Sequence, residues 1–404
     1  MTGPRAVPRT GNRFAGLDGM RAIAAYSIMV THVGFETGLS FGAHPIAPWL
    51  SRLDTAVPIF FMLSGFLLYR PFVVQAMRGN RHPSVTRFYW RRALRVLPAY
   101  WLAIAVTLGL LSTRPARVSD WSSYLSLTEV YDGHDLDTSL SHMWTLAVEV
   151  TFYLVLPVIA ISLRRGRGRP EWIVRSQFAV LGGLAAASVG WQVLAMNVPA
   201  LGYTATAKWL PGSLDWFAGG MLLAVCSAVP AGCAGLARLR DVLGQWAASP
   251  GLCWAFAGGL YWLVSLPLGG PLDLAVPDTW QHLVKHLLEG LAVLFLLLPL
   301  TLGPAGLLDR LLGNRVARFA GEISYGVYLW HLPMLVLLQR ELHVPIFQGH
   351  FWKLFLLTAA SSTVLATVSW LCFERPLLRR FSTPAWRNPV GDSSSRHSAL
   401  TQSA

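Results

Sequence analysis

Apolar stretches of about 20 residues alternate with short polar segments along almost the whole chain. A helix needs about 20 predominantly apolar residues to cross a hydrocarbon core of about 30 Å. Ten stretches meet this requirement, at about 18–35, 54–74, 96–112, 142–163, 177–197, 209–228, 251–268, 283–303, 322–340 and 351–373. The first and the sixth are the weakest by hydropathy alone. The pattern predicts an all-α polytopic membrane protein with about ten transmembrane helices.

The composition excludes an ordinary soluble enzyme. Of the 404 residues, 53% are hydrophobic and only 13% are charged, and the mean hydropathy is +0.46. Soluble domains carry about 25% charged residues. The four cysteines lie in or near the predicted spans or on the inner side, so they imply no disulfide framework.

The distribution of positive charge predicts the topology. The net charge of +13 alone would suit a nucleic-acid-binding protein. If the N-terminus is cytoplasmic, however, 26 of the 33 Lys and Arg residues fall in cytoplasmic segments. This asymmetry is the positive-inside rule. We therefore expect a multi-pass protein of the cell (inner or plasma) membrane, with both termini cytoplasmic and no nucleic-acid partner.

We expect one membrane domain over residues 18–380. A cytoplasmic tail, 1–17, precedes it, and a Ser-, Thr- and Pro-rich cytoplasmic tail, 381–404, is expected to be disordered. The longest outer connection, about 113–141, combines acidic and aromatic residues. It suits a polar cap at the entrance for a substrate, and an ordinary solvated loop is the alternative.

The first predicted span, LDGMRAIAAYSIMVTH, retains Arg21 and His32. They are eleven residues apart, which is about 20° beyond three full turns, so both point from the same helix face. The rise between them is about 16 Å. Arg21 then lies near the cytoplasmic boundary and His32 near or beyond mid-membrane. A snorkelling arginine with an interfacial histidine is the alternative, but ionisable groups within spans are usually functional.

Two later spans bring further ionisable groups to the same depth. In HMWTLAVEVTFYLVLP (142–157), Glu149 lies about 10 Å deep and shares a helix face with His142. In SYGVYLWHLP (324–333), one polar stripe comprises Ser324, Tyr328 and His331. A charged group at the middle of a helix costs about 3 kcal/mol on insertion scales. We therefore predict a buried polar cavity, in which a Glu–His pair sharing a proton would explain the set.

An arginine cluster opens the third span. RFYWRRALRVLPAYW (87–101) carries Arg87, Arg91, Arg92 and Arg95 near the expected helix N-terminus, where free N–H groups favour anions. Guanidinium forks suit phosphate oxygens. The positive-inside rule alone could also produce such a cluster.

One reaction connects the arginines to the mid-depth groups. A coenzyme A thioester has a phosphorylated head and a long thin arm that ends in an activated acyl group. With its head on the arginines, its arm would reach His32, which could take the proton from an acceptor hydroxyl. Glu149 or His331 would orient the base, and an acyl-histidine intermediate is an open alternative. We expect no metal and no permanently bound cofactor.

Six motifs in order resemble membrane acyltransferase family 3. They span about 14–380 and read LDGMRAIAAYSIMVTH, FFMLSGFLLYRPF, FYWRRALRVLPAYW, HMWTLAVEVTFYLVLP, SYGVYLWHLP and FERPLLRR. Members that resemble this chain are ten-helix proteins that O-acylate sugars, glycolipids, peptidoglycan or macrolides, with acyl-CoA as the donor. Two departures concern the acceptor: Pro58 stands where relatives often have Asp, and Val150–Thr151 stands where many have Glu–Gln.

The resemblance implies a role for each candidate residue. It implies that His32 is the essential histidine, with Arg21 as its motif partner, and that Glu149 and His331 belong to the catalytic set. The expected acyl-CoA-binding residues are Arg91, Arg92 and Arg95. Those expected to support the pocket are Ser324, Tyr328, Trp144 and Tyr153.

The resemblance also implies the substrates. We expect transfer of an acetyl group from acetyl-CoA to a hydroxyl of an extracytoplasmic envelope glycan or glycolipid. The 30 arginines against three lysines indicate a GC-rich bacterial source, which adds a mycolate-type lipid to the acceptors.

Two alternatives stay open. One is a macrolide (secondary metabolite) O-acyltransferase, which would use the same site. The other, from a different class, is a proton-coupled transporter or flippase, because intramembrane His and Glu also suit proton coupling. That alternative predicts paired repeats and interrupted helices, and the sequence shows neither by eye.

Overall fold

The computed structural model describes residues 14–41, 44–112, 115–131, 137–163, 170–199, 202, 206–229, 237–272 and 275–381. Across these ranges the chain is helical and contains no strand. The helices are α1 (Ala15–Glu36), α2 (Ala47–Ser51), α3 (Ala56–Met77), α4 (Val85–Val106), α5 (Val118–Ser126), α6 (Trp144–Ser162), α7 (Pro170–Asn197), α9 (Leu214–Ala228), α10 (Ala237–Ala247), α11 (Pro250–Ser265), α12 (Thr279–Thr301), α13 (Leu307–Leu312), α14 (Arg315–Glu341), α15 (Phe351–Ser369) and α16 (Arg375–Phe381).

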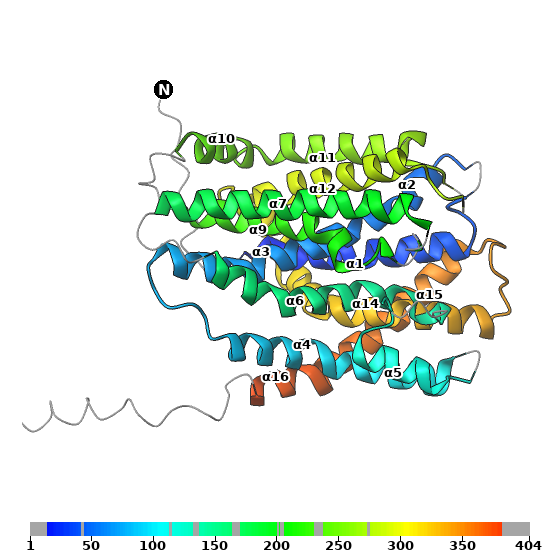
Figure 1. Cartoon of the computed structure of the whole chain (residues 1–404). Coiled ribbons are helices and arrows are strands. Elements are labelled where there is room, and N and C mark those ends of the chain that lie inside the picture. The colour runs from blue at the N-terminus through cyan, green and yellow to red at the C-terminus, as the bar shows by residue number, and fades with distance from the viewer. Residues whose placement is uncertain are drawn as a thin grey trace, which may run out of the picture.

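The long helices lie side by side in one bundle, with their axes in roughly the same direction (Figure 1). α3 packs against α9, α1 and α6, while α14 lies between α1 and α15. The most apolar 18-residue window in α3 is 67% buried, against 22% for α7. α3 is therefore a core helix, whereas α7 presents most of its surface to the surroundings of the bundle.

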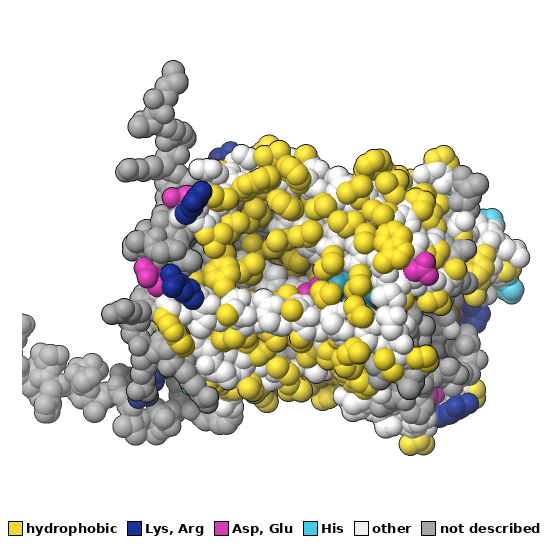
Figure 2. Space-filling view, turned by 45° about the horizontal axis from the view of Figure 1, so that its top comes forward, with side chains coloured by type: hydrophobic (Ala, Val, Ile, Leu, Met, Phe, Trp, Pro, Cys, Tyr) yellow, Lys and Arg dark blue, Asp and Glu magenta, His cyan; other side chains and the backbone are white. Residues whose placement is uncertain are grey.

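Each of the ten predicted spans coincides with a helix, namely α1, α3, α4, α6, α7, α9, α11, α12, α14 and α15. Among the described residues, six helical segments are long and apolar enough to cross a membrane: Ala47–Met77, Val85–Leu111, Thr138–Ser162, Glu171–Asn197, Thr279–Thr301 and Phe351–Phe381. Figure 2 shows a broad band of hydrophobic side chains on one face, with charged groups toward its two ends. Trp262, Leu291 and Leu356 are among the exposed hydrophobic residues. The chain is a multi-pass membrane protein.

The remaining topology stays a prediction. The structure assigns six candidate spans rather than ten, because the other four helices are shorter or more polar. Residues 1–13 and 382–404, which hold most of the two expected tails, lie outside the described residues. The cytoplasmic location of both ends therefore stays a prediction.

The predicted outer connection 113–141 packs onto the bundle over most of its described length. It forms α5 and a 3-10 turn, Thr138–Met143. The Tyr100 hydroxyl donates to the carbonyl of Tyr124 at 2.7 Å, and Trp209 Nε1 donates to the carbonyl of Val130 at 2.9 Å. The carboxylate residue Glu129 is only 2% exposed. These contacts favour a packed cap over a solvated loop.

α3 and α9 approach closely because glycines face backbone at their contact. A Cβ on Gly220 would lie 2.0 Å from the carbonyl oxygen of Met62, and one on Gly65 would lie 2.3 Å from that of Phe217. Small residues of this kind allow membrane helices to pack backbone to backbone.

We expect Gly220→Ala to lower the free energy of unfolding by about 2 kcal/mol, because the added methyl group must push α9 away from α3. The matched control is Gly183→Ala on α7, where a Cβ meets no atom of the described chain within 4 Å. Thermal unfolding in detergent measures both variants. Equal melting temperatures for the two would contradict the close packing.

Candidate active site

His32 on α1 and His331 on α14 form a direct pair. Their Nδ1 and Nε2 atoms are 3.0 Å apart, and His331 Nδ1 lies 2.7 Å from the carbonyl oxygen of Tyr328. A carbonyl only accepts, so His331 Nδ1 carries the hydrogen and, in a neutral ring, Nε2 is the acceptor. His32 Nδ1 therefore donates to His331. The consequence is that His32 Nε2 is left with a free lone pair, which is what a general base requires.

A third histidine, His142, lies beside this pair. Its ring centroid is 4.8 Å from that of His331 and 6.3 Å from that of His32. The Tyr328 hydroxyl donates to the carbonyl oxygen of His142 at 2.7 Å and shares a 2.6 Å hydrogen bond with the Thr145 hydroxyl. His142 was absent from the predicted site residues. The predicted helix face that it shares with Glu149 is wrong, because His142 lies in the 3-10 turn Thr138–Met143 and α6 begins only at Trp144.

A cavity of about 540 Å³ lies on the other side of Tyr328 and Thr145. Its volume is within the usual range of small-molecule sites, about 300–1,000 Å³. It is enclosed by α1, α3, α4, α6 and α14, with a contribution from α16. Eight predicted site residues line it: Arg21, Arg91, Arg92, Arg95, Glu149, Tyr153, Ser324 and Tyr328.

Four of the lining side chains are guanidinium groups and one is a carboxylate. α4 brings three of the arginines here, and it begins at Val85 because the Ser84 side chain accepts from the backbone N–H of Arg87 at 3.3 Å. Arg92 lies over the Tyr153 ring, and Arg95 lies over the Trp370 ring. Within the described ranges, no ion pair joins any of the four arginines to a carboxylate. The cavity is thus electropositive and suits an anionic ligand.

Glu149 faces this cavity and has no histidine partner among the described residues. The Ser64 hydroxyl donates to its carboxylate, which α6 holds on the same side as the arginines. The predicted Glu–His pair is therefore replaced by a His–His pair and a separate Glu149–Ser64 pair. The physical reason is the position of Glu149 along α6, since it lies among the arginines that line the cavity, whereas His142 lies in the turn before α6.

Three predicted residues do not line the cavity, namely His32, His331 and Trp144. Trp144 packs near Phe61, and Lys208 Nζ lies 5.6 Å from its ring centroid. His331 and His142 are 0% and 2% exposed, whereas His32 is half-buried. Tyr328 and Thr145, which share a hydrogen bond, line the cavity, whereas His32, His142 and His331 do not, so this pair lies between the arginines and the histidines.

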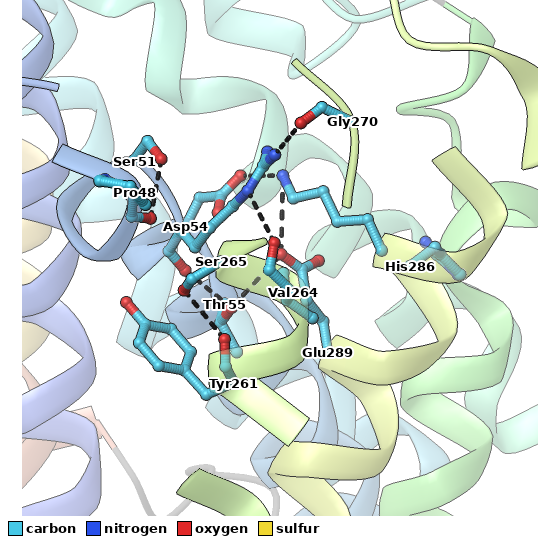
Figure 3. Close-up of polar contacts among 12 residues, drawn as sticks. Pro48, Ser51, Asp54, Thr55, Tyr261, Val264, Ser265, Gly270, His286 and Glu289 are labelled. Atoms are coloured by element: carbon cyan, nitrogen blue, oxygen red, sulfur yellow. Dashed lines mark hydrogen bonds and ion pairs between the residues drawn. The ribbon is translucent and has the colours of Figure 1, made fainter. Parts of the chain in front are cut away.

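A second polar cluster, shown in Figure 3, lies at the start of α3 and of α12. Lys285 Nζ is 2.6 Å from Asp54 and 3.6 Å from Glu289. The Arg52 guanidinium donates to three carbonyls, those of Val264, Gly270 and Pro271, at 2.7 to 3.3 Å. These contacts join the turn after α11 to the beginning of α3. No set of His, Cys, Asp and Glu residues across the described ranges is arranged to hold a metal ion.

We expect Arg52→Met to lower the free energy of unfolding by about 3 kcal/mol, because it leaves three carbonyls short of a donor at about 1–3 kcal/mol each. Arg52 is only 6% exposed. The variant should retain the activity of wild type per folded molecule, since Arg52 touches neither the cavity nor the histidines. Arg340→Met is the control at an exposed arginine. An unchanged melting temperature of Arg52→Met would show that the hydrogen bonds of Arg52 do not stabilise the fold.

Comparison with known proteins identifies the family. A family model described as "Acyltransferase domain" matches residues 14–374. Peptidoglycan O-acetyltransferase OatA of Listeria monocytogenes is 24% identical over 382 residues, covering 89% of this chain and 55% of the relative. O-acetyltransferase OatA of Staphylococcus aureus is 23% identical over 416 residues, covering 94% and 58%. Nodulation protein 10 of Rhizobium leguminosarum bv. viciae is 26% identical over 411 residues, covering 93% and 96%.

The matches differ in how much of each relative they cover. The chain spans little more than half the length of the two OatA relatives, and no solved structure matches it. The family model, in contrast, covers nearly the whole chain. The chain therefore belongs to membrane acyltransferase family 3.

Proposed function

We propose that the chain is an acyl-CoA-dependent O-acyltransferase of the cell membrane, with His32 as the general base. It transfers an acyl group, in the first place acetyl, from cytoplasmic acyl-CoA to a hydroxyl of an extracytoplasmic envelope glycan. A glycolipid or a mycolate-type lipid is the alternative acceptor. The single observation that carries this proposal is the free Nε2 of His32, fixed by the His331–Tyr328 hydrogen bonds.

The arginine cavity is the proposed donor site. Its four guanidinium groups match the phosphates of coenzyme A, and they lie in the halves of α1 and α4 that the positive-inside pattern assigns to the cytoplasmic side. The thin arm of the thioester would extend along the cavity toward Tyr328. The stripe of Ser324 and Tyr328 on α14 leads from the arginines to His331, so an acyl group that displaces the Tyr328–Thr145 pair would arrive beside the histidines.

The chemistry proceeds by direct transfer. His32 Nε2 accepts the proton of the acceptor hydroxyl as the hydroxyl oxygen attacks the thioester carbon. The new C–O bond forms, the C–S bond breaks, and the sulfur leaves as a thiolate. The proton on His32 returns to this thiolate, which restores the neutral base. His331 acts as a positioning residue, because it holds His32 in the tautomer that has its lone pair on Nε2.

The acceptor approaches from the side opposite the donor. Because His32 is half-buried yet does not line the cavity, an acceptor hydroxyl can reach it from outside the cavity. The names of the OatA relatives describe O-acetyltransferases, one of them acting on peptidoglycan. This supports an envelope glycan as the first acceptor to test.

Two acetyl-CoA preparations, one labelled in the acetyl group and the other in the nucleotide, test the proposal. Purified protein is incubated with each of them and an envelope extract. We expect the acetyl label in the acceptor and the nucleotide label in free coenzyme A. Movement of an envelope lipid across proteoliposomes without acetyl transfer would support the flippase alternative and contradict the proposal.

A further inference from the structure

The side chain of His142 is buried without hydrogen-bond partners. It is 2% exposed, and neither Nδ1 nor Nε2 forms a hydrogen bond with any described residue. The backbone carbonyls of Tyr328 and Leu329 approach the ring but fall short of hydrogen-bond geometry. His32 and His331, its neighbours, are both partnered.

An orphaned polar group of this kind is costly. A buried donor or acceptor without a partner costs about 1–3 kcal/mol, so its presence calls for an explanation. An apolar side chain of similar volume, such as leucine, would fill the site without this cost. The structure thus keeps two polar atoms at a place where packing alone favours an apolar side chain.

His142 lies between the donor cavity and the proposed base, His32. Its ring centroid is 5.2 Å from that of Tyr328, which closes the donor cavity, and 6.3 Å from that of His32. In a reactive geometry the attacking oxygen and the acyl carbon are about 3–3.5 Å apart. An acyl group that passes Tyr328 and meets a hydroxyl activated by His32 must therefore lie against His142.

We propose that His142 is a catalytic residue whose ring N–H donates a hydrogen bond to the acyl carbonyl oxygen during transfer. This rests on the proposed acyltransferase function. As the acceptor oxygen bonds to the acyl carbon, the carbonyl electron pair moves onto the carbonyl oxygen, and the N–H of His142 stabilises that negative charge. The pair returns when the C–S bond breaks, so His142 neither gains nor loses a proton.

His142→Phe tests this role against a structural one. The flat aromatic ring is retained and the orphaned nitrogens are removed, while the six-membered ring adds some volume, so the melting temperature should change by only a few degrees. Removing one oxyanion donor lowers kcat by about 10²-fold in other enzymes, and we expect a loss of that size here. The affinity for acetonyl-CoA, a thioether analogue that cannot transfer its acyl group, should be unchanged. His142→Gln, which keeps an N–H donor, should recover at least about tenfold of the lost kcat.

The outcomes separate the two proposals. A kcat of His142→Phe within about threefold of wild type would overturn the role of His142 alone. A lower melting temperature together with lost analogue binding would show that His142 is structural. Absence of transfer by wild type, in contrast, would overturn the proposed function and this inference with it.

Discussion

Replacing His32 with asparagine is expected to lower kcat for acyl transfer by about 10³-fold, the middle of the range for loss of general acid–base catalysis. Asparagine keeps a polar group of similar size near His331, so the fold should be preserved, but its amide cannot take the acceptor proton. The KM for acetyl-CoA should change little, because His32 does not line the donor cavity. Initial rates with labelled acetyl-CoA at several donor concentrations measure both constants.

Two further variants sharpen this test. His331→Leu should lower kcat by about tenfold to 10²-fold, less than His32→Asn, because it removes the partner of His32 Nδ1 and leaves the base itself in place. His82→Ala, at an exposed histidine, is the matched control and should behave as wild type. If His331→Leu were as inactive as His32→Asn, His331 would be more than a positioning residue. If His32→Asn kept the kcat of wild type, His32 would not be the base.

The helices could be predicted from the sequence because their signal is local. A run of about 20 apolar residues is by itself long enough for a helix that crosses the membrane, and each predicted run coincides with a helix. Which helices pack together is not local information. The approach of α3 and α9 depends on Gly65 and Gly220, which are 155 residues apart, and neither glycine is distinguishable in the sequence from one that faces lipid.

The grouping of the candidate site residues could be predicted from the sequence only in part. The spacing of ionisable groups along α1 and α14 placed His32 and His331 at a common level, and the structure joins them. The partner of Glu149 could not be predicted, because it depends on how α6 is rotated toward Ser64. His142 was missed for a similar reason, since only coordinates reveal that its ring nitrogens are unpaired.

The contacts of the second polar cluster could not be predicted from the distribution of charge along the sequence. The predicted topology counts Arg52 and Lys285 among the seven basic residues outside the cytoplasmic segments. In the structure, Arg52 is buried and holds three carbonyls, and Lys285 holds two carboxylates. The charge pattern therefore assigns these two residues to a side of the membrane, but it does not predict the contacts that they make in the folded protein.

The arginines of α4 are expected to act on donor affinity rather than on the chemical step. The double variant Arg92→Gln/Arg95→Gln should lower kcat/KM for acetyl-CoA by about 10³-fold, since hydrogen bonds to charged groups contribute about 1.5–3 kcal/mol each. The rate at saturating donor should fall far less. Arg87→Gln, on the same helix but outside the cavity lining, is the control.

A truncated donor decides whether the arginines bind the phosphates. S-acetyl-pantetheine carries the same thioester and arm but no phosphate, so wild type and the double variant should use it with nearly equal kcat/KM. Raising the ionic strength should narrow the difference seen with acetyl-CoA, because salt screens charged contacts of this kind. If the double variant lost as much activity with the truncated donor as with acetyl-CoA, the two guanidinium groups would serve the fold or the acyl group instead. That result would show that the electropositive cavity is not the coenzyme A site.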